Sequence, residues 1–595
     1  MKLKNIFLLG AATVAFTACD DMFTPALENN QDISQMYNDA DFARGLLYNA
    51  YLVLPYDGSP TTELATDNAV SNDIDNNYKK MATGSWAANN NPINQWDVRY
   101  HAIQYCNIMI ENAAKVSWGY SNPGMNQMYI DNFLGNAYAL RGLHMMYLLR
   151  AHAGFVGGEY LGVPIHNSSE DGSSDFNLPR NTFKECVDSI MSDFDKALAL
   201  LPEEYGDVAE GGVPAKYTKL DADNSHYNRA FGNVQRGKID GRIISAFKAQ
   251  LAIMAASPAY AEAGAMTYAD AAKYAAECLT KFGGLSGLQQ DGWKWYDSDL
   301  IDNMGATDKN PAEIIWRGNL EKSNGLESDN YPPTLFGKGR VNPTQNLVDA
   351  FPMANGYPIT ADRDKSGYDP KNPYAGRDPR LAAYILVNGS TIGVDDTPIN
   401  TQADSETLDG LNRENGSSTT TGYYMRKLMR STINLNPSSK TDAYHLQARI
   451  RVTEILLDYA EAANEAQGPK VAVGGAPYTA YDVIKALRKR AGVAVSADPY
   501  LEECASSKDK MRELIRNERR LELCFENHRF WDLRRWKANL TDSAKGINIT
   551  NVGGVPTYKT FDVEARDYKD YMIYGPIPYS EVLKWSNLLQ NDGWR

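Results

Sequence analysis

The 595-residue chain is poor in cysteine and histidine, with six and seven residues respectively. No pair of cysteines has Cys-x-x-Cys spacing, and after Cys19 the next cysteine is Cys106. Neither a disulfide framework nor a clustered zinc site is therefore indicated. The five cysteines beyond Cys19 lie mostly in apolar helical runs, so we expect them to be buried, free thiols.

Basic residues are fewer than acidic ones: the chain has 60 Lys and Arg and 74 Asp and Glu, for a net charge of −14. A chain of this charge repels polyanions, which excludes nucleic acid as an expected partner. Two catalytic signatures are missing: the Gly-x-Ser-x-Gly elbow of hydrolases and a glycine-rich phosphate loop ending in Lys-Ser or Lys-Thr. The sequence does not exclude a glycoside hydrolase, since folding could bring any two of its acidic residues together as the catalytic pair.

Only one apolar run stands out, residues 6–18 behind Lys2 and Lys4, and it is too short to span a bilayer. It reads as a signal peptide over residues 1–18. Small residues precede Cys19 as in a bacterial lipoprotein cleavage box, so we expect Cys19 to be acylated and residues 19–40 to form a lipid anchor and tether. The acidic residues Asp20 and Asp21 resemble the surface-export signal of Bacteroidetes lipoproteins.

Apolar residues recur at helical spacing through the first half of the chain. In the strongest segment, residues 132–151, the stripe includes Phe133, Leu140 and His144, and we interpret His144 as a core residue rather than a ligand. Further helices are predicted at residues 41–54, 95–116, 182–201, 241–256 and 268–282. This rhythm of paired helices over residues 41–283 suggests a helical-repeat scaffold.

Between residues 284 and 441 glycine, proline, asparagine and aspartate rise and helical periodicity disappears. We predict a loop-rich insertion with short strands, one of them at residues 313–316. Helices return at residues 448–466, 481–491 and 508–526, within a C-terminal region over residues 442–595 that packs on the repeats. Irregular segments held by a scaffold are where binding residues usually lie.

Four acidic residues, Glu454, Asp458, Glu461 and Glu465, step by four, three and four along one predicted helix face. Such a face could bind a metal, but the arginines crowded into residues 516–535 favour ion pairing within the chain. His528 lies in that segment without the His-x-x-x-His or Glu-x-x-His spacing of a catalytic metal site. We therefore expect no metal here.

Two aromatic neighbourhoods suit a sugar, whose apolar C–H faces stack on rings while its hydroxyls meet polar side chains. The first is the polar loop over residues 67–96, where Trp86 is the expected exposed platform. Trp96 begins a predicted helix, and we place it in the core. The second neighbourhood is residues 293–296, Trp-Lys-Trp-Tyr.

Residues 517–536, Asn-Glu-Arg-Arg-Leu-Glu-Leu-Cys-Phe-Glu-Asn-His-Arg-Phe-Trp-Asp-Leu-Arg-Arg-Trp, strongly resemble the C-terminal signature of the SusD-like (RagB/SusD) family of nutrient-binding outer-membrane lipoproteins. Further agreement lies at residues 342–353, 377–381, 456–465, 575–578 and 590–594. With the cleavage box before Cys19, the resemblance covers essentially the whole chain.

The resemblance implies a mainly α fold: a scaffold of four tetratricopeptide-like helix pairs with an irregular, loop-rich second half. It implies a non-catalytic protein that binds oligosaccharides on the outer face of the outer membrane and passes them to a SusC-like TonB-dependent transporter. The alternatives are a surface glycoside hydrolase and a helical-repeat scaffold for protein interactions.

The family's ligand contacts vary between members, so individual residues are hypotheses. By position in the starch-binding member, the resemblance suggests Trp86 and the pair Trp295 and Tyr296. The full predicted ligand set, completed by polar residues of the first loop and by the arginine of the 377–381 motif, is Asp67, Asn68, Asp73, Tyr78, Trp86, Trp295, Tyr296 and Arg377. No cofactor is predicted; so acidic a chain could hold a structural calcium ion, although no Asp-x-Asp-x-Asp-Gly loop argues for one.

Overall fold

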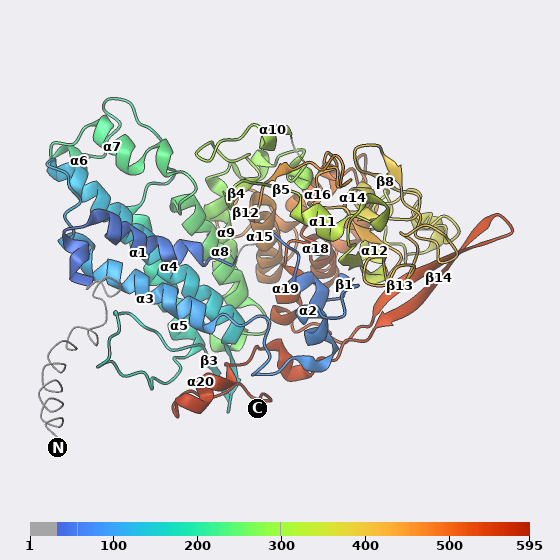
Figure 1. Ribbon diagram of the computed structural model, residues 1–595, viewed down its shortest axis with the longest axis horizontal. Helices are drawn as coiled ribbons and strands as arrows, with labels where there is room; N and C mark the ends of the chain where they lie inside the picture. Colours follow the sequence, from blue (N-terminus) through green and yellow to red (C-terminus); the bar gives the residue numbers. More distant parts are fainter. Residues whose placement is uncertain (1–32, 56–57, 298) are drawn as a thin grey trace, which may run out of the picture.

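The computed structural model describes residues 33–55, 58–297 and 299–595. Cys19 and most of the predicted leader and tether lie outside the described residues. The prediction of a mainly α protein is confirmed. As Figure 1 shows, long helices fill one half of the molecule, short elements and loops fill the other, and the C-terminal helices lie between the two.

The long helices of the first half begin at side-chain caps that the sequence supplies. Thr182 and Glu185 form a reciprocal capping box at the start of α5, and Asn122 caps α4 with proline at the first helical position. The long helices are α1 (Ala40–Leu52), α3 (Trp96–Asn112), α4 (Pro123–His152), α5 (Phe183–Leu200), α8 (Gly241–Ala256) and α9 (Tyr268–Thr280). The shorter ones are α2 (Asn77–Lys80), α6 (Ala215–Thr218) and α7 (Asn224–Phe231).

These helices pack in sequence order, α1 on α3, α3 on α4, α4 on α5, α5 on α8 and α8 on α9. The next partner of α9 comes from far along the chain, because α15 packs on both α9 and α8. One continuous apolar core includes buried residues from Met36, before α1, to Leu588, close to the C-terminus. The helical array is therefore a single stack to which the C-terminal region adds the last layer.

Helices of the C-terminal region are α15 (Val452–Gln467), α16 (Ala480–Arg490), α17 (Pro499–Cys504), α18 (Lys508–Glu522), α19 (Arg529–Arg535) and α20 (Tyr579–Lys584). The expected helix over residues 448–466 is partly wrong, because residues 448–451 form a strand that pairs with residues 314–317. The predicted strand at residues 313–316 is that partner.

The irregular half contains short helices and small sheets around a second apolar core that includes Trp295, Tyr384 and Phe525. Its helices are α10 (Asp299–Asp302), α11 (Gly325–Asn330), α12 (Gln345–Ala350), α13 (Arg363–Ser366) and α14 (Pro379–Tyr384). The strands of the described residues form antiparallel pairs: β1 (Ala69–Ser71) with β6 (Val341–Pro343), β2 (Gly154–Val156) with β3 (Glu159–Leu161), β4 (Ile314–Arg317) with β12 (Ala448–Arg451), β5 (Glu321–Ser323) with β11 (Ala443–His445), β7 (Ile385–Leu386) with β10 (Tyr424–Met425), β8 (Thr391–Ile392) with β9 (Thr397–Pro398), and β13 (Ala544–Val552) with β14 (Val555–Glu564).

The longest of these pairs, β13 and β14, is a hairpin that projects from the body at the end opposite the first helices (Figure 1). Gly553 and Gly554 make its two-residue turn with φ of 61° and 85°. Positive φ at both turn residues matches the right-handed twist of the flanking strands, and glycine adopts it without strain.

Several residues that the sequence assigned to the interior are there. His144 is fully buried; it lies 2.9 Å from the Ala50 carbonyl oxygen and 3.2 Å from Arg99. Trp96 is 6% exposed. The cysteines of the described residues are buried and free, as predicted, and are Cys106, Cys186, Cys278, Cys504 and Cys524.

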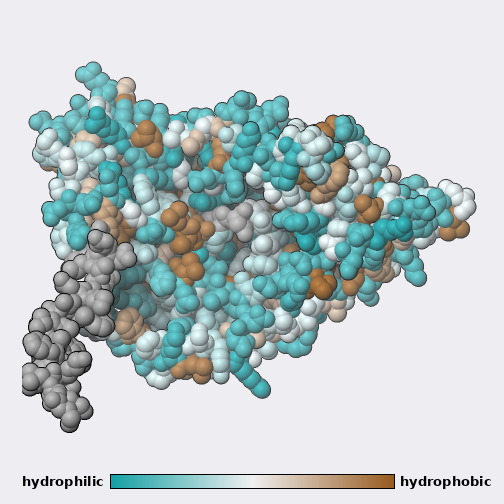
Figure 2. All heavy atoms as spheres, in the orientation of Figure 1, coloured by the Kyte–Doolittle hydropathy of each residue, from teal (hydrophilic) through white to brown (hydrophobic). Residues whose placement is uncertain are grey.

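The acidic face of α15 pairs mostly with arginines, as predicted. Asp458 lies 2.7 Å from Arg519, and Glu461 lies 2.5 Å from Arg535. Among the described residues no group of three or more His, Cys, Asp and Glu side chains is arranged to hold a metal ion. Within the same residues no helix is both long and apolar enough to cross a membrane. The face in Figure 2 is mostly hydrophilic, with apolar side chains in small separate groups.

The helical stack and the irregular half are joined by a buried network of charges centred on Glu522 in α18. Its carboxylate lies 2.9 Å from Arg380 of α14, 2.8 Å from Arg490 of α16 and 4.0 Å from Arg451 of β12. All four side chains are at most 2% exposed. The surrounding guanidinium groups hold the pKa of Glu522 well below its usual range, although burial alone would raise it.

We predict that Glu522→Gln lowers the free energy of unfolding by about 3–5 kcal/mol, because three buried cations then lose a shared counter-charge. Urea unfolding followed by circular dichroism measures the change. Glu210→Gln, at an exposed glutamate, is the matched control and should stay within about 0.5 kcal/mol of the parent. A Glu522→Gln protein as stable as that control would contradict the central role of the network.

Candidate functional site

A cavity of about 1040 Å³ opens where the helical stack, the C-terminal helices and the irregular half meet. Helices α4 and α8 supply one wall, and α15 and α19 supply a second. Residues 58–62, 445–449 and 525–528, strand β5, and parts of the segments 71–78, 295–296 and 325–341 supply most of the rest. A hollow of this volume is within the range of small-ligand sites.

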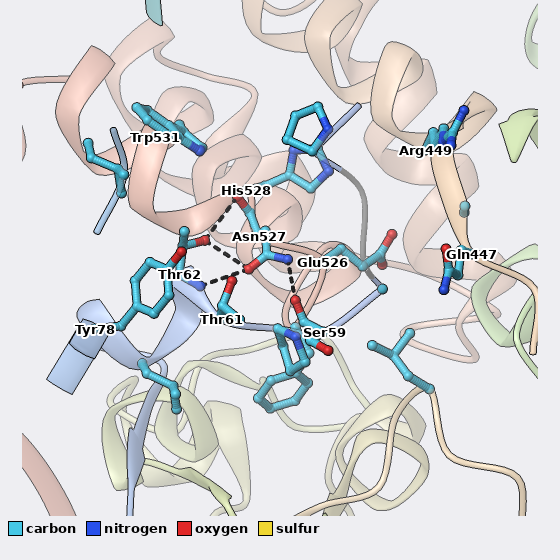
Figure 3. A pocket seen from close by; sticks show the side chains of 18 of the residues that line it. Ser59, Thr61, Thr62, Tyr78, Gln447, Arg449, Glu526, Asn527, His528 and Trp531 are labelled. Carbon is cyan, nitrogen blue, oxygen red and sulfur yellow. Dashed lines mark hydrogen bonds between the residues drawn. The ribbon is translucent and has the colours of Figure 1, made fainter. Parts of the chain in front are cut away.

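Asn527 fixes the early loop that forms one edge of the cavity. Its side-chain oxygen accepts hydrogen bonds from the backbone and hydroxyl of Thr62, both at 2.9 Å, and its amide donates to the Ser59 carbonyl at 2.7 Å. Figure 3 shows Asn527 between these two residues, with Trp531 on one side and Gln447 and Arg449 on the other. Asn527 has φ of 65°, a left-handed conformation that asparagine tolerates better than most residues.

Asp67 and Asn68, predicted to contact a ligand, are structural residues outside the cavity wall. The Asp67 carboxylate lies 2.8 Å from Arg529 and 3.0 Å from Arg520. Asn68 is fully buried, accepts a hydrogen bond from Arg520 at 2.7 Å and donates to Glu63 at 2.8 Å. The expectation that this loop is weakly buried is therefore wrong at its beginning.

Trp86 is not the exposed platform that we expected. It is 3% exposed, its indole donates to Asn91 at 3.0 Å, and its ring lies 4.9 Å from that of Trp594 and 6.1 Å from those of Phe530 and Tyr568. These rings form a small separate core with the C-terminal residues. Trp86 and Trp96 both pack inward because other side chains cover each ring, and the Trp86 indole N–H is satisfied locally by Asn91.

The other half of the predicted set comes together on the cavity. Asp73, Tyr78, Trp295 and Tyr296 all line it, although the first two and the last two are more than 200 residues apart in the chain. Trp295 and Tyr296 are only 7% and 6% exposed, and the Trp295 indole nitrogen has no hydrogen-bond partner. Both rings therefore contribute mainly an edge to the wall, whereas Tyr78 is half-buried and more accessible.

Arg377 lies away from the cavity and holds the chain together. Its terminal nitrogens donate to the carbonyl oxygens of Pro373, Val348 and Phe351 at 2.6–2.8 Å. With its guanidinium committed to three backbone groups and 7% of the residue exposed, Arg377 closes a loop and lies outside the cavity lining.

Sequence reasoning missed the residues that α19 and α15 bring to the wall. Trp531 is half-buried on the cavity, one residue beyond a ring of the small core. Glu454 lines it too; its Oε1 accepts from Gln250 at 2.7 Å, while its Oε2 has no hydrogen-bond partner. Burial, then the neighbouring Asp458 charge, raises the pKa of Glu454. Trp531 belongs to the family signature at residues 517–536, but nothing in that signature indicates that its ring is partly exposed.

Fold and cavity together define a helical-repeat protein with a ligand-sized hollow between its repeats and an irregular half. Comparison with known proteins gives the family. Residues 306–594 match the SusD family model, and residues 27–211 match a model described as starch-binding associating with outer membrane. The chain belongs to the SusD-like family, a family of carbohydrate-binding proteins.

Among characterised relatives, SusD-like protein P2 of Formosa agariphila is 30% identical over 144 residues. That match covers 24% of this chain and 25% of the relative, so it spans about a quarter of each protein. The match therefore supports membership of the family but does not show the ligand or the partners of this chain.

Solved structures of the family share the whole fold. A SusD-like protein from Bacteroides fragilis NCTC 9343 has a TM-score of 0.70 at 23% identity, over 96% of this chain and 100% of its own. A SusD-like carbohydrate binding protein from the same organism has a TM-score of 0.65 at 21% identity, over 93% and 100%. Surface glycan-binding protein A from Bacteroides fluxus has a TM-score of 0.57 at 17% identity, over 93% and 99%. The tetratricopeptide-like scaffold that the sequence led us to expect is thus confirmed.

Glu63 generates a prediction about pH, because it is fully buried beneath the cavity loop beside Asn68. Burial raises its pKa to about 7, and the hydrogen bond from Asn68 only partly opposes this. An unfolded glutamate has a pKa of about 4.3. Between about pH 4.3 and pH 7 the folded protein therefore holds a proton on Glu63 that the unfolded chain does not hold, and the free energy of unfolding falls as pH rises through this range.

We predict that Glu63→Gln, which imitates the protonated acid, changes how the free energy of unfolding depends on pH. The loss of stability between pH 4.5 and 7.5 should be about 2–3 kcal/mol smaller in this variant than in the parent. Urea unfolding at a series of pH values provides the measurement. Glu406→Gln at an exposed position should follow the parent curve. Parallel curves for Glu63→Gln and the parent would show that Glu63 titrates normally.

Proposed function

We propose that this protein is a cell-surface glycan-binding lipoprotein that delivers oligosaccharides to a SusC-like TonB-dependent transporter without catalysing a reaction. The observation that carries the proposal is the cavity of about 1040 Å³, which opens between the scaffold and the irregular half of a SusD-like chain.

The lining of the cavity suits a sugar. The rings of Tyr78 and Trp531 are half-buried, so each offers an apolar surface to a pyranose C–H face. Asp73 and Gln447 add the oxygen and amide groups that sugar hydroxyls require. Rings beside short polar side chains are the combination that binds a neutral hydroxylated ring in water.

A non-catalytic role is supported by the state of the carboxylates on the wall. Glycoside hydrolysis needs two carboxyl groups free to exchange protons or attack. Asp458 and Asp532 are held by Arg519, each at 2.7–2.8 Å, and Glu526 lies 2.7 Å from Arg451. Of these four, Glu454 has no arginine partner at that distance, and the other acids of the described wall that lack a basic partner, Asp73 and Glu321, lie on the early loop and on β5 rather than beside it on α15.

The proposed address is the outer face of the outer membrane. The family model describes association with that membrane, and the Cys19 cleavage box followed by two aspartates supports a lipid anchor that faces outward. Two or three acyl chains on one cysteine would hold the protein there persistently.

We predict that purified protein binds at least one member of a glycan panel saturably and releases no reducing ends. Tyr78→Ala should weaken that binding about five- to tenfold, because it removes about 1 kcal/mol or more of ring stacking. Calorimetry measures both proteins, and Tyr579→Ala, at an exposed tyrosine outside the cavity lining, is the matched control.

New reducing ends in the same mixtures would favour the hydrolase alternative. A folded protein that binds none of a broad panel would favour the protein-interaction scaffold. Unchanged affinity in Tyr78→Ala would remove this ring from the site without touching the proposal of glycan binding.

We further predict that affinity purification from detergent-solubilised outer membranes recovers a TonB-dependent transporter with this protein. In intact cells, protease should cleave the wild-type protein, while Cys19→Ala should no longer fractionate with membranes on its own. Cys106→Ala is the control for loss of a thiol. A protein that purifies alone in mild detergent and survives protease treatment, while surface controls are cleaved, would contradict both the partner and the orientation.

A further inference from the structure

One corner of the cavity carries positive charge that no acid balances. Arg150, in the last turn of α4, places its guanidinium carbon 4.3 Å from the ring centroid of Trp531 and 4.9 Å from that of Tyr147. All three residues line the cavity. Within the described part of the chain, no side chain or backbone group forms a hydrogen bond or ion pair with the Arg150 guanidinium, so its N–H groups are available to a ligand.

Arg534 adds a second such charge one helical turn beyond Trp531. It is 4% exposed, lies 3.5 Å from the ring centroid of Phe530 and 4.9 Å from that of Tyr568, and donates to the Phe530 carbonyl at 3.2 Å. Burial lowers the pKa of Arg534 to about 10, so it stays charged at neutral pH. No carboxylate of the described residues lies within ion-pair distance of it.

Other buried arginines show how unusual this environment is. Arg180 is comparably buried and also lacks a carboxylate, but it donates to four carbonyl oxygens and to Asn591. Arg377 donates to three carbonyl oxygens. Arg534 instead meets aromatic faces, which stabilise a cation by the ring quadrupole without cancelling its charge.

Most acids of α19 and α15 on the cavity are already paired; Glu454 of α15 has no arginine partner, but burial raises its pKa and favours its uncharged form. Asp532 lies 2.8 Å from both Arg519 and Arg535, and Asp458 lies 2.7 Å from Arg519. Asp73 and Glu321 line the cavity from the early loop and from β5, which are different walls. The corner formed by Arg150, Trp531 and Arg534 is therefore electropositive in a chain whose net charge is −14.

We propose that this corner binds the anionic group of an acidic glycan, either the carboxylate of a uronic acid residue or a sulfate ester, with Arg150 as the contact residue. This inference rests on the proposed function and names the class of glycan that the site takes. A guanidinium that lies over an indole ring, with no hydrogen-bond partner among the described residues, keeps its N–H groups free, and a pair of them matches two oxygens of a carboxylate or sulfate. Arg534 is part of the wall but almost fully buried, so it acts through its charge.

The test uses the purified protein and three sets of oligosaccharides of equal length: a neutral galactan, an oligogalacturonide and a sulfated galactan. At least one acidic set should bind about tenfold or more tightly than the neutral set, and added salt should narrow the difference. The uronate and sulfate sets distinguish the two sources of negative charge.

Arg150→Gln should weaken binding of the preferred acidic set about ten- to a hundredfold, because a charge-assisted bidentate contact is lost. It should leave affinity for the neutral set within about twofold. Arg150→Lys should retain part of the preference, since it keeps the charge and loses the planar edge. Arg413→Gln, at an exposed arginine outside the cavity lining, is the matched control.

Thermal unfolding separates binding from packing. If Arg150→Gln lowers the melting temperature but leaves acidic affinity unchanged, the cation only braces Trp531 and the inference is overturned. If neutral oligosaccharides bind as tightly as acidic ones, the inference also fails while the proposed function stands. If no oligosaccharide of any class binds, the proposed function fails and the inference fails with it.

Discussion

Glu522 is the point on which the architecture depends, because its single carboxylate faces cations from three separate segments of the chain. Neighbouring acids extend the pattern: Glu518 lies 2.5 Å from Arg380, and Glu313 lies 2.7 Å from Arg451. The irregular half has only short sheets of its own, so much of its position relative to the helices is set by these buried ion pairs. Such pairs are costly to desolvate, and they tolerate little displacement once formed. A cavity bounded by both halves can keep its shape only if this junction is rigid.

The helices were predictable because each has a local cause. The expected bounds of α8 coincide with the observed ones, and Thr182 marks the start of α5 through its capping box with Glu185. The first turns of α4 were missed, although Asn122 before a proline is a start signal that the sequence displays. The hairpin β13–β14 was missed as well, although two glycines between alternating apolar residues indicate one. Strand β12 was not readable as a strand, because its partner β4 lies about 130 residues earlier.

The site was less predictable than the fold, since exposure depends on contacts that no local pattern records. Trp86 stands in a polar loop and looks exposed from its neighbours, yet the ring that lies closest to it belongs to Trp594, more than 500 residues later. Trp531 shows the opposite case. It lies in α19, whose apolar residues and arginines suggest a buried structural role, yet it lines the cavity. Tyr78 and Asp73, chosen for their residue types, line the cavity. The charge of the corner around Arg150 emerges only when α4 and α19 meet.

The loop at residues 58–62 is held by Asn527, and Asp67 by Arg520 and Arg529, so the cavity joins parts of the chain that are about 460 residues apart. During synthesis the first helices can pack as soon as they are available, because their contacts are between neighbours in the sequence. Asn527 and α19, which complete the cavity, belong to the last eighth of the polypeptide. A nascent or truncated chain that lacks this segment therefore has the helical scaffold but not the complete cavity.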